Sequence, residues 1–179
     1  MTVGTPEFSR PVRVDTLGTT PRALSIGANA EERAALAKRF GLLGIERLSA
    51  EAALTRSGDE VRAAGTLSAA VTQSCVATDL PVPETVEESF EIVFRPQPET
   101  SAEEEIELSD GELDVVFYDG ASIDVGEAVA ETMSLSLDPY PRSPEAEIAL
   151  KQAGVKSEEE AAPLSPLAGL KDLLAGKKN

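Results

Sequence analysis

Two alternating apolar segments joined by a short turn constrain the fold of this chain most strongly. Alternate positions are apolar in residues 48–54 and again in residues 61–71, and residues 57–59 (Ser-Gly-Asp) separate the two segments. A period of two places alternate side chains on one face of a strand, and a Gly-containing turn between such segments is typical of a hairpin. The pattern therefore predicts a β-hairpin with one buried face, and its many small residues predict close packing against that face.

Two other segments have the spacing and the end signals of helices. Residues 28–40 have Asn29 as a cap, acidic residues in the first turn, basic residues in the last turn, and Gly41 at the end. Residues 123–137 have Asp124 as a cap with a glutamate three positions later, which resembles a capping box. We expect one amphipathic helix from each segment.

Residues 8–14, 82–94 and 113–118 have the composition of further strands. The fold class predicted from all these elements is α+β, with an antiparallel sheet or partial barrel, two main helices and an extended C-terminal tail.

We expect residues 1–142 to form the folded domain, with a mobile acidic loop at about 99–107. Residues 143–179 are expected to be a largely flexible tail that contains a short helix at 166–175. The leucines of that helix either dock on a partner or fold back on the body of the protein.

The negative charge of the chain is concentrated in one stretch. The net charge is −16, and residues 84–114 contain twelve acidic side chains and one basic side chain, whereas residues 1–83 contain nine of each. Such a charge repels phosphate at long range, which disfavours broad nucleic-acid binding, but it favours encounter with basic proteins. The carboxylates predicted to face a basic partner are Glu84, Glu87, Glu88, Glu91, Glu103, Glu104 and Glu105.

Several kinds of chemistry are excluded by composition. The chain has no histidine, so a catalytic triad that uses histidine and a histidine metal site are both absent. Its single cysteine, Cys75, precludes an intramolecular disulfide and a multi-cysteine zinc site. We predict that the chain is not an enzyme and has no cofactor, metal site or catalytic residue. Cys75 is expected to be a buried or half-buried small apolar residue, and its acidic surroundings favour the protonated thiol over the thiolate.

The chain lacks an apolar run of about 20 residues, the length needed to span a bilayer, and a signal peptide. We expect it to be soluble and cytoplasmic.

Three alternatives stay open. The carboxylates could serve a carboxylate- or cation-dependent hydrolase, which requires several acids in one concave pocket. A deep apolar pocket in the sheet would instead indicate a small-molecule binding module. Arg10, Arg13 and Arg22 could contact rRNA directly, although the charge of the chain disfavours it and scattered solubilising arginines are the simpler interpretation.

Three blocks of sequence in the same order resemble the YceD family. Residues 71–82 contain a cysteine and then Pro-Val, like that family's central motif, residues 123–131 resemble its Ile-Asp helix, and residues 135–142 resemble its proline-containing segment. Residues 166–170 resemble its closing helix. The positions that carry the resemblance are Cys75, Pro81, Asp124, Glu131, Pro139, Pro141 and Arg142.

The resemblance implies a function. YceD proteins are bacterial proteins with plastid relatives, and they are implicated in the accumulation of large-subunit ribosomal RNA. It implies a non-enzymatic ribosome biogenesis factor whose partner is a ribosome-assembly protein or a pre-ribosomal particle. Some members carry further cysteines that suggest a zinc site, but Thr78 stands where their second cysteine would be, so no metal is expected here.

Overall fold

The computed structural model describes residues 6–97 and 114–155. A five-stranded sheet has the order β2-β3-β4-β5-β6. Its strands are β2 (Arg22–Gly27), β3 (Gly44–Ser57), β4 (Glu60–Ser74), β5 (Pro81–Pro96) and β6 (Asp114–Tyr118). A separate antiparallel ribbon contains β1 (Pro11–Arg13) and β7 (Ser122–Asp124). The helices of the described part are α1 (Ala30–Phe40), α2 (Val125–Leu135), α3 (Ala146–Gln152) and a single 3₁₀ turn (Val14–Thr16).

The predicted hairpin is the centre of the sheet and is longer than its sequence pattern. Strands β3 and β4 pair antiparallel around Gly58, whose φ of 62° favours glycine. Gly65 in β4 allows β3 to approach closely, because a Cβ there would lie 2.0 Å from the Glu51 carbonyl oxygen. The apolar positions of the pattern are the buried ones, as predicted, with Leu54, Val61 and Leu67 fully buried.

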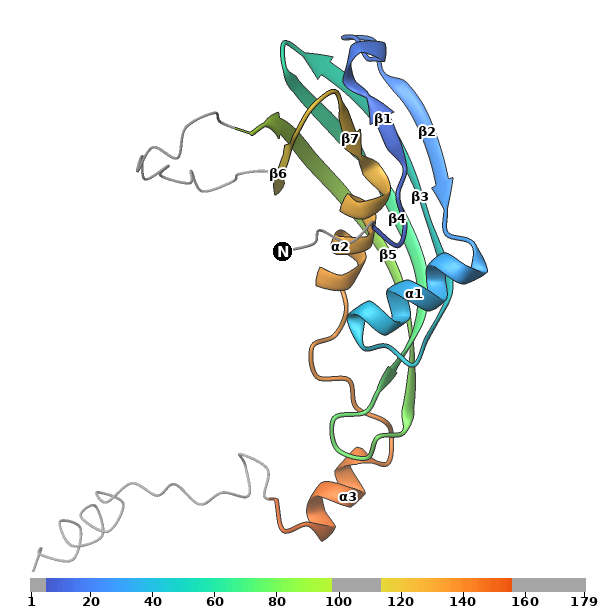
Figure 1. Ribbon diagram of the computed structural model, residues 1–179. Helices are drawn as coiled ribbons and strands as arrows, with labels where there is room; N and C mark the ends of the chain where they lie inside the picture. Colours follow the sequence, from blue (N-terminus) through green and yellow to red (C-terminus); the bar gives the residue numbers. More distant parts are fainter. Residues whose placement is uncertain (1–5, 98–113, 156–179) are drawn as a thin grey trace, which may run out of the picture.

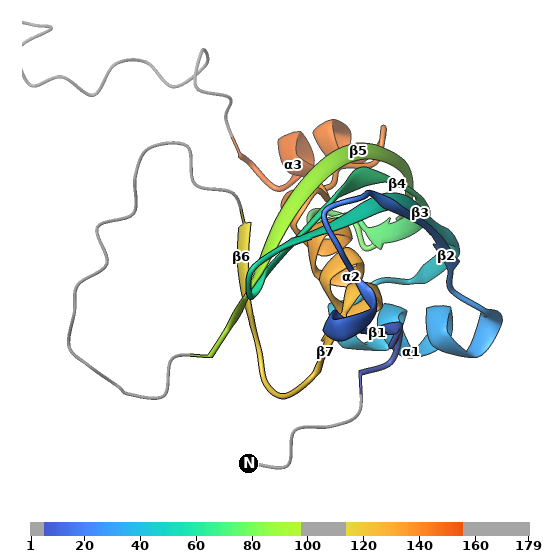
Figure 2. The same ribbon diagram turned by 90° about the horizontal axis from the view of Figure 1, so that it is seen from above.

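The sheet curves around α2, and α1 and the β1–β7 ribbon lie on the same side of it (Figures 1 and 2). Met133 and Val129 of α2 are fully buried in the same apolar cluster as the inward-facing residues of β3, β4 and β5. Burying a side chain of this size stabilises a fold by about 1.5–3 kcal/mol. We call the other side of the sheet the open face. Glu51, Thr66 and Ser89 on that face are exposed.

Both main helices begin at the predicted caps. The Asn29 side chain accepts hydrogen bonds from the amides of Glu31 and Glu32, and Glu32 completes a capping box. Asp124 caps α2 through the amides of Gly126 and Glu127. The second capping box is wrong, because the Glu127 carboxylate binds Arg39 instead.

The α+β fold is confirmed, but the sheet is mixed rather than wholly antiparallel. Strand β6 runs parallel to β5, with Ile92 opposite Asp114 and Pro96 opposite Tyr118. A short turn would have forced antiparallel pairing, whereas the long connection between these strands lets the chain return and run in the same direction. Within the described residues the sheet stays open and does not close into a barrel.

Two described elements were not predicted, and one was predicted too long. Strand β2 lies where the sequence indicated no element, and α3 lies within the expected tail, at the end of the sheet where β4 is joined to β5 (Figure 1). The predicted strand at 8–14 contains only β1. The acidic loop at 99–107 and the helix at 166–175 lie outside the described residues.

Candidate interaction surface

The four described carboxylates of the predicted acidic surface lie on two faces of β5. Alternation along the strand places Glu87 and Glu91 on the open face, and Glu84 and Glu88 on the same side as the buried Val86. A hydrolase needs its carboxylates to converge on one bond. The alternation therefore separates these four groups instead of gathering them into one catalytic cluster.

The two carboxylates on the open face pair with the protein's own arginines. Glu87 Oε1 lies 3.5 Å from Arg47 Nη2 and accepts a hydrogen bond of 2.6 Å from the Ser68 hydroxyl. Glu91 pairs with Arg62 in the same way. All four charged side chains are well exposed, so each pair contributes only about 0–1 kcal/mol. Such weak pairs can exchange with cationic groups from another protein.

Glu84 has a structural role. Its carboxylate accepts a 2.7 Å hydrogen bond from Gln73 Nε2 and a 3.3 Å bond from the Asp138 amide, which fixes the chain after α2 to the sheet. Glu88 is exposed and has no ion pair among the described residues. Of the four carboxylates, Glu88 is therefore the one with neither an ion pair nor a side-chain hydrogen bond among the described residues.

The ends of the most acidic stretch lie on neighbouring strands. Strand β5 ends at Pro96 and β6 begins at Asp114, and the Gln97 amide donates a 3.0 Å hydrogen bond to the Tyr118 carbonyl. The connecting residues 98–113 carry seven acidic side chains and no basic one. Glu103, Glu104 and Glu105 are among them and lie outside the described residues. Both attachment points of this acidic segment are thus at the β5–β6 edge.

The three arginines considered for rRNA contact are held by neighbouring groups. Arg10 makes two hydrogen bonds of 2.8 and 2.9 Å to the Glu32 carboxylate, and these bonds lower the pKa of Glu32. Arg13 pairs with Asp15, whose pKa it lowers. Arg22 donates a 3.2 Å hydrogen bond to the Thr16 hydroxyl.

Cys75 lies in the loop after β4 and is buried, as predicted. Its sulfur accepts hydrogen bonds from the amides of Ser143, at 3.3 Å, and Ala77, at 3.5 Å. Burial of the thiol raises its pKa, but these amides and the hydroxyls of Thr78 and Ser143 outweigh burial and bring the pKa to about 6. The expectation of a protonated thiol is therefore wrong: local donors act on the sulfur more strongly than the acidic sequence context.

The family of the chain follows from a comparison with protein-family models. The model described as large ribosomal RNA subunit accumulation protein YceD matches residues 63–174, which is more than half of the chain. The chain belongs to the YceD family. Neither the curated proteins nor the solved structures gave a match. Membership assigns the chain to the process for which the family is named, accumulation of the large-subunit ribosomal RNA.

Several YceD motif positions hold the fold together. Asp124 caps α2 and also accepts hydrogen bonds from the Arg10 amide, at 2.7 Å, and from the Ser9 hydroxyl, which attaches the N-terminal segment to the helix. The Pro141 carbonyl accepts a 3.0 Å bond from the Val76 amide, beside the Cys75 contact with Ser143. Pro81 begins β5 opposite the last residue of β4.

Arg39 joins α1 to α2 and to the N-terminal segment, a role that its position as a basic residue in the last turn of a helix does not predict. It donates hydrogen bonds to Glu127, at 2.7 Å, and to Glu7, at 3.0 Å, and it lies 3.7 Å from the motif residue Glu131. These hydrogen bonds raise the pKa of Arg39.

The structural role of Gln73 was also not predicted, although the sequence contains a signal for it. It is the polar residue at an inward position of the otherwise apolar β4 alternation, and its amide binds Glu84 and the Asp138 carbonyl. A polar side chain at a buried strand position indicates a specific buried hydrogen bond.

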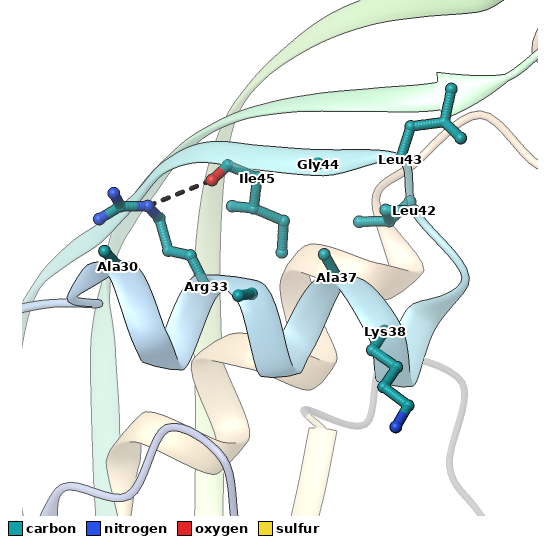
Figure 3. A pocket seen from close by; sticks show the side chains of 9 residues that line it. Ala30, Arg33, Ala37, Lys38, Leu42, Leu43, Gly44 and Ile45 are labelled. Atoms are coloured by element: carbon teal, nitrogen blue, oxygen red, sulfur yellow. Dashed lines mark hydrogen bonds between the residues drawn. The ribbon is translucent and has the colours of Figure 1, made fainter.

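The described grooves lie where helices meet strands or loops. One groove, of about 430 Å³, lies between α1 and the start of β3 (Figure 3). Arg33 at its edge donates hydrogen bonds to the carbonyls of Ile45, at 3.1 Å, and Ala28, at 2.7 Å, so the guanidinium is occupied in holding α1 to β3.

Residues 6–97 and 114–155 contain no cluster of three or more His, Cys, Asp or Glu side chains that could hold a metal ion. No helix in this part of the chain is long and apolar enough to cross a membrane.

Proposed function

We propose that this YceD-family chain is a non-enzymatic, cytoplasmic assembly factor of the large ribosomal subunit that binds a basic protein partner. The observation that carries the proposal is the attachment of the most acidic stretch, residues 84–114, to one sheet edge. This edge combines exposed carboxylates on β5 with the seven acidic residues that connect β5 to β6.

Charge complementarity explains why the partner would be a protein rather than RNA. Proteins that bind rRNA are basic, and an acidic edge raises their rate of encounter. Direct rRNA contact through Arg10, Arg13 and Arg22 is less favoured, because Arg10 and Arg13 already pair with carboxylates and the whole chain repels phosphate.

Three observations favour binding over catalysis. The β5 carboxylates point to two faces, the sequence has no histidine, and in the groove between α2 and β6, which four acids line, Asp124 caps α2 and Glu127 pairs with Arg39. Together they weigh against a hydrolase more than against a binding protein, and they support a role through surface recognition.

Affinity purification of the full chain from growing cells tests the proposal. Changing Glu103, Glu104 and Glu105 to lysine should reduce the capture of precursor large subunits about tenfold or more at low salt. The matched control changes Glu158, Glu159 and Glu160, the same triplet in the C-terminal segment, and should leave capture unchanged.

A second pair of variants tests the strand itself. Glu88→Lys on β5 should weaken capture, whereas Glu51→Lys on β3, which is equally a single exposed strand carboxylate, should not. Equal capture by the wild type, the variant with lysine at 103–105 and Glu88→Lys would refute the electrostatic part of the proposal. Absence of any ribosomal component from wild-type capture would refute the assembly role.

A further inference from the structure

A groove with a partly apolar lining lies between the C-terminal ends of α1 and α2. Its volume is about 350 Å³, and its apolar lining is Phe40, Leu42, Leu135, Leu137 and Pro139. Leu135 is 82% exposed, although Met133, two residues before it on the same helix, is fully buried. Single exposed leucines are common, but Leu135 is flanked in this groove by Phe40 and Leu137, which the core covers only in part.

The polar edge of this groove is negatively charged. Asp138 lines it, and Glu84 lies behind Asp138 and accepts a hydrogen bond from its amide. An occupant that fits the groove therefore presents leucine-like side chains together with a positive charge.

The chain has one such segment beyond Val155, the last described residue. Residues 166–175 contain Leu167, Leu170, Leu173 and Leu174, a spacing typical of one helix face. Residues 161–179 carry three lysines and a single aspartate, in a chain with a net charge of −16. This segment has both properties that the groove requires.

The connection to the groove is short. The Ser143 amide binds Cys75, which is two residues from Gln73 in the groove lining, so the chain passes close to the groove before it enters α3 at the end of the sheet. Only α3 and the residues after it separate this point from the leucine-rich segment. The eleven residue-to-residue steps from Val155 to Pro166 can span at most about 36–40 Å.

We propose that the leucine-rich segment 166–175 of the same chain docks in the groove between α1 and α2. The leucines cover Leu135, Leu137 and Phe40, and Lys171 lies near Asp138. This inference is independent of the proposed function, because it concerns a different surface and the protein alone.

Disulfide trapping in the full chain tests the docking. Cys75 is buried, so the double variant Leu135→Cys/Leu170→Cys adds the reactive thiols to an otherwise inaccessible background. Leu135 is so exposed that its replacement does not disturb the core. Mild oxidation should form an intrachain disulfide, with a rate that does not depend on protein concentration.

The matched control is Thr85→Cys/Leu170→Cys. Thr85 is exposed on the open face, next to Glu84 in the sequence and on the other side of the sheet from the groove. Docking predicts that the Leu135 pair forms its disulfide about tenfold faster than this control, because a docked segment has a higher effective concentration. Adding Leu173→Asp to the Leu135 pair should slow it to the rate of the control.

Three results would overturn the inference. Equal rates for the two cysteine pairs would show that the segment only diffuses near the protein. An undiminished rate with Leu173→Asp would show that the leucines do not hold it. Interchain disulfides that increase with concentration would show that a second copy fills the groove.

Discussion

Replacing Asp124 by alanine should destabilise the fold more than any other single change to a half-exposed carboxylate discussed above. Asp124 caps α2 and accepts hydrogen bonds from the Arg10 amide and the Ser9 hydroxyl. Loss of a cap lowers the free energy of unfolding by about 1 kcal/mol, and loss of each hydrogen bond to a partly buried charge lowers it by about 1 kcal/mol more at this exposure. The expected loss is therefore about 3 kcal/mol.

Chemical and thermal unfolding followed by far-ultraviolet circular dichroism measures this loss. For a chain of this size, about 3 kcal/mol lowers Tm by roughly 6–12 °C. Asp124→Asn keeps an acceptor at the cap and should lose about half as much. Asp59→Ala, at a position 82% exposed in the hairpin turn, is the control and should change stability by less than about 0.5 kcal/mol. An Asp124→Ala variant as stable as this control would refute the reasoning.

Three further changes have expected outcomes. Gly65→Ala should lower the free energy of unfolding by about 2 kcal/mol or more in thermal unfolding, because the new Cβ meets the backbone of β3. The control Gly27→Ala, whose Cβ would be 3.8 Å from the nearest atom, should be nearly neutral. Equal effects of the two changes would contradict the close approach of β3 to Gly65. The pKa of the Cys75 thiol is about 6 in the folded protein and lower than in the unfolded chain, so the thiolate contributes stability at alkaline pH that is lost as the pH falls through 6. Titration of the thiolate by ultraviolet absorbance should give this pKa, and Thr78→Val should raise it. An ordinary thiol pKa would contradict the role of the hydrogen-bond donors around the sulfur. Arg39→Ala should lower the free energy of unfolding by about 1 kcal/mol, and this loss should be smaller at high salt because salt screens the ion pairs. A loss that salt does not alter would show that the carboxylates around Arg39 contribute nothing.

The parts of the fold that depend on local pattern were predictable. The alternation of residues 48–71 gave the hairpin, and the caps Asn29 and Asp124 gave the starts of both main helices, because each signal lies within a few residues of the structure it determines. The family was also predictable, since the blocks that resemble it all lie within residues 63–174, which the family model matches.

The parts that depend on distant contacts were not predictable. The parallel direction of β6 depends on where a long connection returns, and no local pattern encodes that. Strand β2 is half-exposed and forms through pairing with β3. Glu87 pairs with Arg47, which lies on a strand forty residues earlier in the sequence. The local sequence around Glu87 therefore does not show that an arginine partly neutralises its charge on the folded sheet.

The ratio of large-subunit to small-subunit ribosomal RNA in growing cells tests the central claim most directly. The gene is deleted and the cells are complemented with the wild type, with lysine at 103–105, or with lysine at 158–160. The account predicts that deletion lowers the ratio, that the wild type and the 158–160 variant restore it, and that the 103–105 variant does not. Full restoration by the 103–105 variant, or a ratio that deletion leaves unchanged, would contradict it.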